Sequence, residues 1–244
     1  MRIAVLADIH GNLLALEAVR ADLRSRSPDL VVNLGDHVSG PLWAAETADL
    51  LMSLDWIHIR GNHDRQLLDR PYTAMGASDQ AALAQLRPRH LAWLAALLGT
   101  VRLDAGVFLC HGTPASDVEY LLEEVTPSGT VQPASPLLIQ HRLGGIQDAL
   151  VLCGHTHIPR VAGGIANPGS VGLPAYDDAA PYAHCMEAGS PHARYAVADL
   201  VDGLWLVTPR VVEYDWEAAA QRAAAGGRAD WACALRTGRA LRAG

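Results

Sequence analysis

Histidine and aspartate side chains follow several short apolar runs of this chain, at the points where each run meets a turn. The stretch LVLCGHTHIPR, residues 150–160, places His155 and His157 two positions apart directly after an apolar run. The stretch ADIHGN, residues 7–12, places Asp8 and His10 in the same way. Residues i and i+2 of a strand project to the same side, so the two side chains of each pair could bind one ion between them.

Three further polar residues follow apolar runs: Asp36 after DLVVNLG, Asn62 after WIHIRG and His111 after GVFLC. Together the candidate ligands are Asp8, His10, Asp36, Asn62, His111, His155 and His157. Seven nitrogen and oxygen ligands exceed the four of a tetrahedral zinc site. They suit two ions about 3.5–4 Å apart that share a bridging carboxylate, and such a centre attracts phosphate and activates a hydroxide. Imidazole and carboxylate without thiolate favour manganese, iron or zinc.

His63 adjoins Asn62 and need not be a ligand itself. Asp64 could hydrogen-bond one nitrogen of its ring and leave the other nitrogen facing a substrate. That arrangement suits protonation of a departing alkoxide, or stabilisation of charge in the transition state.

Three other side chains are candidates for substrate contact. His37 adjoins Asp36, Arg65 follows the GNHD block, and His192 lies in SPHARY, within a segment that could cover the site. Simpler interpretations stay open, because strand alternation could turn His37 away and Arg65 could be a solvated helix residue. Asn167 in NPGS could hold its segment close to the site, although an ordinary turn explains it as well.

The elements that must position these residues alternate along the first part of the chain. Apolar runs of four to six residues are typical of buried strands, and residues 13–26 and 41–54 have the pattern of helices, the first capped by Asn12. This order predicts a parallel sheet, in which functional residues gather beyond the carboxyl ends of the strands. Residues 113–136 have no clear periodicity and are expected to form a loop. A hairpin is predicted over 160–170, and antiparallel strands joined at Asp202 and Gly203.

Five ordered motif blocks resemble the calcineurin-like metallophosphoesterase superfamily: DIH with GN (8–12), GD (35–36), GNHD (61–64), HG (111–112) and GHTH (154–157). The segment NPGSVGLP, residues 167–174, is similar to the small prokaryotic phosphodiesterase-like branch. The resemblance spans residues 1–214. It implies a four-layer α/β/β/α sandwich, an α/β fold in which two mixed β-sheets pack face to face with helices outside.

By position, the resemblance puts a first metal on Asp8, His10, Asp36 and His157, and a second on Asp36, Asn62, His111 and His155. His157 and His155 would then serve different ions. His63 matches the catalytic histidine of the family and Asp64 its partner.

The function that this resemblance implies is a dinuclear metal-dependent phosphoesterase, in which a metal-bridging hydroxide attacks a phosphate ester. A small phosphodiester or nucleotide substrate is favoured, with manganese as the first choice of metal and iron or zinc as alternatives. A phosphomonoesterase, including a phosphoprotein phosphatase, is the alternative. A non-catalytic scaffold is disfavoured, because the ligand set and His63 with Asp64 are all present.

Charge and length bound the remaining possibilities. A formal net charge of -7 without a Lys/Arg run disfavours stable binding of nucleic acid, and with it a nuclease. No stretch approaches the ~20 apolar residues of a membrane span, and the first residues lack the core of a signal peptide, so a cytoplasmic protein without membrane attachment is expected. We expect one domain over residues 1–215, and a helical tail over 216–244 that packs on this domain or on a second copy in a homo-oligomer.

Overall fold

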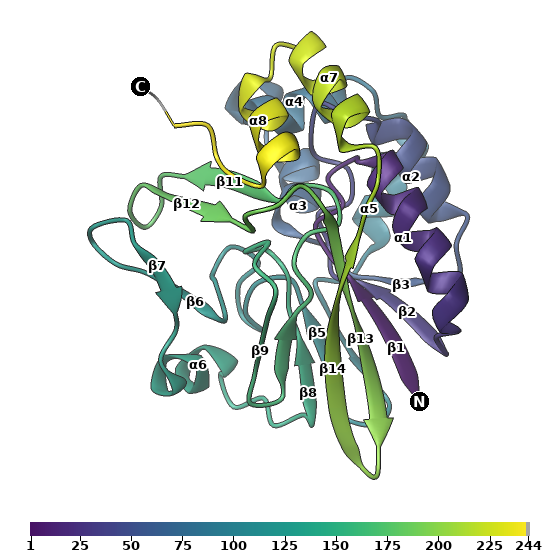
Figure 1. The fold of residues 1–244 in the computed structure, drawn as a ribbon, viewed down its shortest axis with the longest axis vertical. Helices are drawn as coiled ribbons and strands as arrows, with labels where there is room; N and C mark the ends of the chain where they lie inside the picture. Colours follow the sequence, from purple (N-terminus) through teal and green to yellow (C-terminus); the bar gives the residue numbers. More distant parts are fainter. Residues whose placement is uncertain (243–244) are drawn as a thin grey trace.

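The computed structural model describes residues 1–242, and two five-stranded mixed sheets form its centre (Figure 1). The first sheet contains, in spatial order, β14 (Leu204–Val212), β13 (Ala193–Val201), β1 (Arg2–Leu6), β2 (Leu30–Asn33) and β3 (Ile57–His58). The second contains β4 (Thr100–Leu103), β5 (Val107–Cys110), β8 (Leu150–Leu152), β10 (Ile165–Asn167) and β9 (Arg160–Ala162).

Parallel pairing in the first sheet confirms the predicted alternation of strands and helices. Strands β1, β2 and β3 are parallel, and α1 (Leu13–Arg26) and α2 (Ala44–Met52) connect them on the outer face of the sheet (Figure 1). Asn12 caps α1, because its side-chain oxygen accepts a hydrogen bond of 3.2 Å from the Ala15 amide. Antiparallel β13 and β14 complete the sheet and turn at Asp202 and Gly203, as predicted.

The second sheet has parallel strands at its centre and antiparallel strands at its edges. β5, β8 and β10 are parallel, whereas β4 and β9 pair antiparallel with β5 and β10. The pair of β9 and β10 is the hairpin predicted over residues 160–170. Helix α6 (Pro136–Leu143) covers the outer face, where Ile139 and Leu143 pack against Phe108 and Val151.

The two sheets bury a common apolar core between them. Val5 of β1 faces this core with Leu109 and Leu152 of the second sheet, while the next residue, Leu6, faces α1 and packs with Leu16. This alternation follows from the two-residue period of a strand. Burial of each such side chain contributes about 1.5–3 kcal/mol. The predicted four-layer α/β/β/α sandwich is therefore confirmed.

Shorter elements surround one end of the sandwich. Four short helices follow β3, namely α3 (Asn62–Asp69), η1 (Tyr72–Ala74), α4 (Ala77–Leu83) and α5 (Pro88–Ala96). Two hairpins were not predicted, β6 (Glu123–Val125) with β7 (Val131–Pro133) and β11 (Ala175–Asp178) with β12 (His184–Glu187). The loop predicted over 113–136 is wrong where β6 and β7 form. Strands of three or four residues with polar members carry no readable period.

The tail after β14 forms α7 (Trp216–Ala225) and α8 (Ala229–Thr237). Both helices pack on the same chain, where Trp231 and Leu235 contact the cluster that contains Leu42 and Leu173. Figure 1 shows them at the end of the molecule where α4 and β11 lie. Residues 243–244 of the predicted tail lie outside the described part of the chain. Among residues 1–242, no helix combines the length and apolar character that crossing a membrane requires.

Candidate active site

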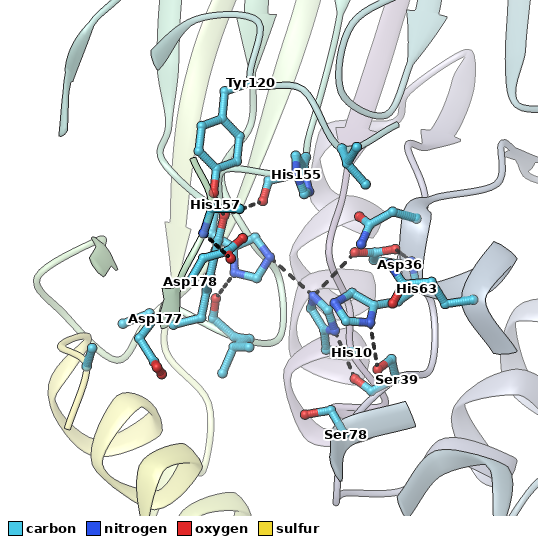
Figure 2. Close-up of a pocket in the computed structure, with 18 of the residues that line it drawn as sticks. His10, Asp36, Ser39, His63, Ser78, Tyr120, His155, His157, Asp177 and Asp178 are labelled. Atoms are coloured by element: carbon cyan, nitrogen blue, oxygen red, sulfur yellow. Dashed lines mark hydrogen bonds and ion pairs between the residues drawn. The ribbon is translucent and has the colours of Figure 1, made fainter. Parts of the chain in front are cut away.

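A cavity of about 950 Å³ lies beyond the carboxyl ends of the central strands, and it contains most of the candidate ligands. Figure 2 shows His10, Ser39 and His63 on one wall and Tyr120, His155 and His157 on the other. The first wall follows strands of the first sheet, and the second follows strands of the second sheet. The cavity therefore joins the two halves of the fold.

The candidate ligands lie just past their strands, in turns with unusual backbone geometry. Left-handed φ angles occur at Asp8 (56°), His10 (50°), Asp36 (55°), His155 (70°) and His157 (59°). The expectation that strand alternation orients these pairs is wrong, because β1 ends at Leu6 and β8 at Leu152. Backbone hydrogen bonds hold the turns, such as that from the His10 amide to the Asp36 carbonyl at 2.9 Å. Left-handed non-glycine residues are sparse in proteins and gather at functional sites.

Two buried groups of three side chains gather at the cavity, and two members of each group line it. In the first, ligand atoms of Asp8, His10 and His157 lie within 4.8 Å of one another, and in the second those of Asp36, His111 and His155 do. His155 and His157 therefore belong to different groups.

Two further contacts extend these groups. The Asn62 side-chain oxygen lies 2.9 Å from Nε2 of His111 and so adjoins the second group. One Asp36 oxygen lies 3.3 Å from Nε2 of His111 and 3.8 Å from Nε2 of His10, between the two groups.

Hydrogen bonds fix which ring nitrogen of these histidines points into the cavity. Nδ1 of His10 donates to the Ser39 carbonyl at 2.8 Å, and Nδ1 of His157 donates to the Leu173 carbonyl at 2.6 Å. A carbonyl only accepts, so Nδ1 carries the hydrogen and Nε2 of the neutral ring presents a lone pair. The two Nε2 atoms lie 3.2 Å apart, an arrangement that a cation between them would stabilise.

The protonation states and an unpaired oxygen agree with a cation site. Burial lowers the pKa of His10 and of His155 to about 4, so both rings are neutral at neutral pH. Burial also acts to lower the pKa of His111, but the Asp36 carboxylate outweighs it and raises that pKa to about 10. A proton on His111 would then compete with a cation. Buried Oδ1 of Asp8 has no hydrogen-bond partner among the described residues. The donor set therefore fits two divalent cations.

His63 lines the cavity with a side chain that is about one-third exposed. Its Nδ1 lies 2.8 Å from a carboxylate oxygen of Asp79, which also accepts a hydrogen bond of 2.6 Å from the Ser39 hydroxyl. Nε2 is then the nitrogen that a substrate can reach. Asp79 belongs to α4 and is almost completely buried. No motif in the sequence pointed to it.

The predicted hydrogen bond between Asp64 and His63 is wrong. Asp64 occupies the first turn of α3, so its side chain points back toward the start of the helix. There it accepts hydrogen bonds from the amides of Asp36, His37 and Gly61 and from Nδ1 of His37. Asp64 thus holds the backbone that carries Asp36. A Cβ on Gly61 would lie 2.3 Å from an Asp36 oxygen, which explains why glycine opens GNHD.

None of the three residues predicted to contact substrate, His37, Arg65 and His192, lines the cavity. His37 is fully buried, with its ring against Trp93 and its Nδ1 on Asp64. Arg65 forms two hydrogen bonds of 2.7 and 2.8 Å with Asp117. His192 packs on Trp216 in the tail. Each of these side chains contacts a residue that is close in space but distant in the sequence, and this contact holds it away from the site.

Aromatic residues that the motifs did not reveal contact the histidines. The Tyr176 ring lies 4.7 Å from that of His157, and its hydroxyl donates to the His155 carbonyl at 3.1 Å. The Tyr120 ring lies 5.1 Å from that of His155. The role expected for Asn167 is confirmed, because its amide donates to the Gly154 carbonyl at 2.7 Å and to the Thr156 hydroxyl at 3.0 Å. Asn167 thereby fixes the turn that carries both histidines.

Comparison with known proteins agrees with this fold and site. Residues 1–159 match the calcineurin-like phosphoesterase family, so the chain belongs to that family. It is a metallophosphoesterase, a hydrolase of phosphate esters.

Two solved structures and one sequence relative illustrate the similarity. A metallophosphoesterase structure from Sphaerobacter thermophilus is 25% identical with a TM-score of 0.73, over 98% of this chain and 99% of that one. A hypothetical protein from Pyrococcus horikoshii OT3 has the same TM-score and coverage at 19% identity, which supports the fold. An uncharacterized protein of Methanocaldococcus jannaschii is 38% identical over 68 residues, which is 28% of each chain.

Proposed function

We propose that this chain hydrolyses a small phosphodiester by means of two divalent metal ions, with manganese as the first candidate and iron or zinc as alternatives. The observation that carries the proposal is the pair of buried groups in one cavity, with Asp36 between them and histidine Nε2 lone pairs converging. Nitrogen and oxygen donors without thiolate suit these metals.

The chain's own residues divide into two sets around the ions. Asp8, His10 and His157 would hold one ion and Asn62, His111 and His155 the other, while Asp36, which lies between the two groups, would serve both. Divalent ions in such a pair supply Lewis-acid activation of the phosphoryl group and of the attacking water. The backbone carbonyls that accept from Nδ1 keep the rings of His10, His111 and His157 oriented for this role.

His63 would give a proton to the departing alkoxide. Burial acts to lower its pKa, but the negative charges of Asp36 and Asp79 prevail and raise it to about 9, so the ring is protonated at neutral pH. Asp79 accepts the hydrogen bond from Nδ1 and leaves the Nε2 proton for the leaving group. A positioned general acid of this kind contributes about 10²–10⁴-fold to the rate.

The charge of the cavity lining favours a diester over a monoester. Besides Asp36, its lining contains five carboxylates against three arginines: Glu119, Glu124, Asp177, Asp178 and Asp230, with Arg70, Arg142 and Arg228. Two of these arginines already face carboxylates, Arg142 with Glu119 at 3.6 Å and Arg228 with Asp230 at 2.6 Å. A diester carries one negative charge and a monoester near two, so this lining penalises the diester less.

The aromatic walls can receive the second substituent of a diester. Tyr120, Tyr176 and Trp231 line the same cavity as the two groups. Aromatic rings pack well against planar or apolar groups, so a nucleotide diester is one substrate of the proposed kind.

The test uses protein stripped of metal and reloaded with manganese, assayed on bis-p-nitrophenyl phosphate and p-nitrophenyl phosphate. We expect the diester to be preferred, and His63→Ala to lose at least about 100-fold in kcat while it still binds two ions. His192→Ala is the matched control, since this histidine lies outside the cavity, and it should behave as wild type. A preference for the monoester would indicate a phosphomonoesterase. No hydrolysis of either substrate with two ions bound would contradict the proposal and favour a scaffold.

A further inference from the structure

We propose that helix α8 of the C-terminal tail belongs to the metal site, and that Trp231 is a positioning residue for the ion held by Asp8, His10 and His157. The proposal rests on the proposed function in taking His10 as a metal ligand. Trp231 lies beyond residue 159, where the match to the phosphoesterase family ends. The tail would therefore supply a part of the site that the five motif blocks do not contain.

Trp231 contacts both the ring of His10 and the backbone that orients it. The indole is 5% exposed, and its ring centroid lies 6.0 Å from that of His10 in an edge-on arrangement. It also packs directly on Gly40, where an added Cβ would lie 2.4 Å from Cη2 of the indole. Ser39, the residue before Gly40, provides the carbonyl that accepts from Nδ1 of His10. One side chain thus restrains the ring and its hydrogen-bond acceptor together.

Contacts on two sides fix α8 in this place. On one side, Trp231 and Leu235 join the apolar cluster of Leu42, Leu173 and Ala175. On the other, the guanidinium of Arg228 donates to the Ser78 hydroxyl at 3.0 Å and lies 5.7 Å from the centre of the Trp231 ring.

Ser78 links Arg228 to the turn that carries Ser39 and Gly40. Its carbonyl accepts a hydrogen bond of 3.1 Å from the Gly40 amide, so Arg228 and Trp231 hold the same turn from two directions. Figure 2 shows Ser78 below Ser39 and His10 on this wall of the cavity.

Helix α8 supports the first group of candidate ligands rather than the second. The rings of the second group have other supports, because Nδ1 of His111 donates to the Leu34 carbonyl and the His155 ring packs on Tyr120. Among the described residues, the aromatic contact of Trp231 with a candidate ligand is the one to His10. Removal of the indole should therefore weaken the binding of the first ion and leave the binding of the second ion unchanged.

The expected loss of metal affinity can be taken from other residues that orient metal ligands. Replacing such a residue lowers metal affinity by about 10–100-fold, because the ligand gains freedom that binding must remove. Trp231→Ala leaves an empty volume beside His10 and Gly40, so this range should apply to the first ion. The phenylalanine ring of Trp231→Phe fills much of that volume and should recover most of the affinity.

The experiment is calorimetric titration of the metal-free, full-length protein with manganese. Wild type should show two sites. Trp231→Ala should weaken one site by about 10–100-fold and leave the other within about threefold, with Trp231→Phe closer to wild type. Trp216→Ala is the matched control, because this second tryptophan of the tail lies outside the cavity and should leave both sites unchanged. Should Trp231→Ala fail to fold, Trp231→Leu fills part of the volume without an aromatic edge and decides in the same way.

Two results would overturn the inference while the proposed function stands: two unchanged sites in Trp231→Ala, or equal weakening of both sites, which general destabilisation would produce. Wild-type protein that binds no ion would instead contradict the proposed function and the inference together.

Discussion

Nδ1 of His63 lies 2.8 Å from a carboxylate oxygen of Asp79, although the two residues come from different helices, α3 and α4. The Ser39 hydroxyl donates to the same oxygen. A buried carboxylate that is not in any motif block therefore orients the candidate acid. Asp64, which follows His63 in the GNHD block, instead accepts hydrogen bonds from backbone amides.

Asp79→Asn should lower the pKa of His63 in the metal-free protein from about 9 toward the ordinary value of 6.5, because one of the charges that outweighs burial is removed. A raised pKa means that the folded state binds the proton more tightly than the unfolded state. The resulting stability is fully present below pH 6.5 and is lost as the pH rises through about 9. Histidine-labelled protein followed by NMR titration measures the pKa, and an unchanged midpoint in Asp79→Asn would contradict the contact.

His155→Ala and His157→Ala should each leave one manganese ion bound, because the two rings belong to different groups. The double variant should bind none tightly. Equilibrium dialysis of stripped protein against manganese measures the stoichiometry of each variant. If either single variant lost both ions, or if the double variant still bound one, the two-group arrangement would be refuted.

Asn167→Ala should lower the free energy of unfolding by about 1–3 kcal/mol, because it leaves the buried Gly169 amide without its partner and removes one of the two hydrogen bonds to the Gly154 carbonyl, which keeps that from the Thr156 amide. Urea denaturation measures this change. Ser128→Ala, in the exposed turn between β6 and β7, is the control and should stay within about 0.5 kcal/mol of wild type. Equal stabilities of the two variants would rule out the bracing role of Asn167.

Arg65→Ala should leave KM for a phosphate ester within about twofold of wild type, because Arg65 pairs with Asp117 and does not line the cavity. Arg70→Ala is the matched arginine variant. Arg70 lines the cavity, and its loss should raise KM because a positive charge near the anionic substrate is removed. Steady-state kinetics on both variants decides, and a larger effect at Arg65 would reverse the assignment.

The sequence predicts the sandwich and the site where local pattern and topology coincide. Apolar runs in the sequence predict buried strands such as Arg2–Leu6 and Leu150–Leu152. Parallel order then brings their carboxyl ends together, which is why Asp8 and His157 meet although 149 positions separate them. The motif blocks assigned His155 and His157 to separate groups, which spacing alone did not.

Other features depend on contacts that carry no local signal. Asp79 reaches His63 through the packing of α4, and Trp231 reaches His10 through the packing of α8. His37 and Arg65 were placed near substrate by adjacency along the chain, whereas Asp64 and Asp117 hold them elsewhere. The hairpin of β11 and β12 was missed because its strands are four residues long and partly polar.

The left-handed backbone at Asp8, His10, Asp36, His155 and His157 has a consequence for protein engineering. A non-glycine residue in this conformation costs about 1–2 kcal/mol, so a search for stabilising substitutions would favour glycine at these five positions. Each such gain would remove a side chain on which the proposed chemistry depends. Thermal stability and catalytic activity thus favour different residues at these positions. A library selected for thermal stability alone should accumulate glycine there and lose activity.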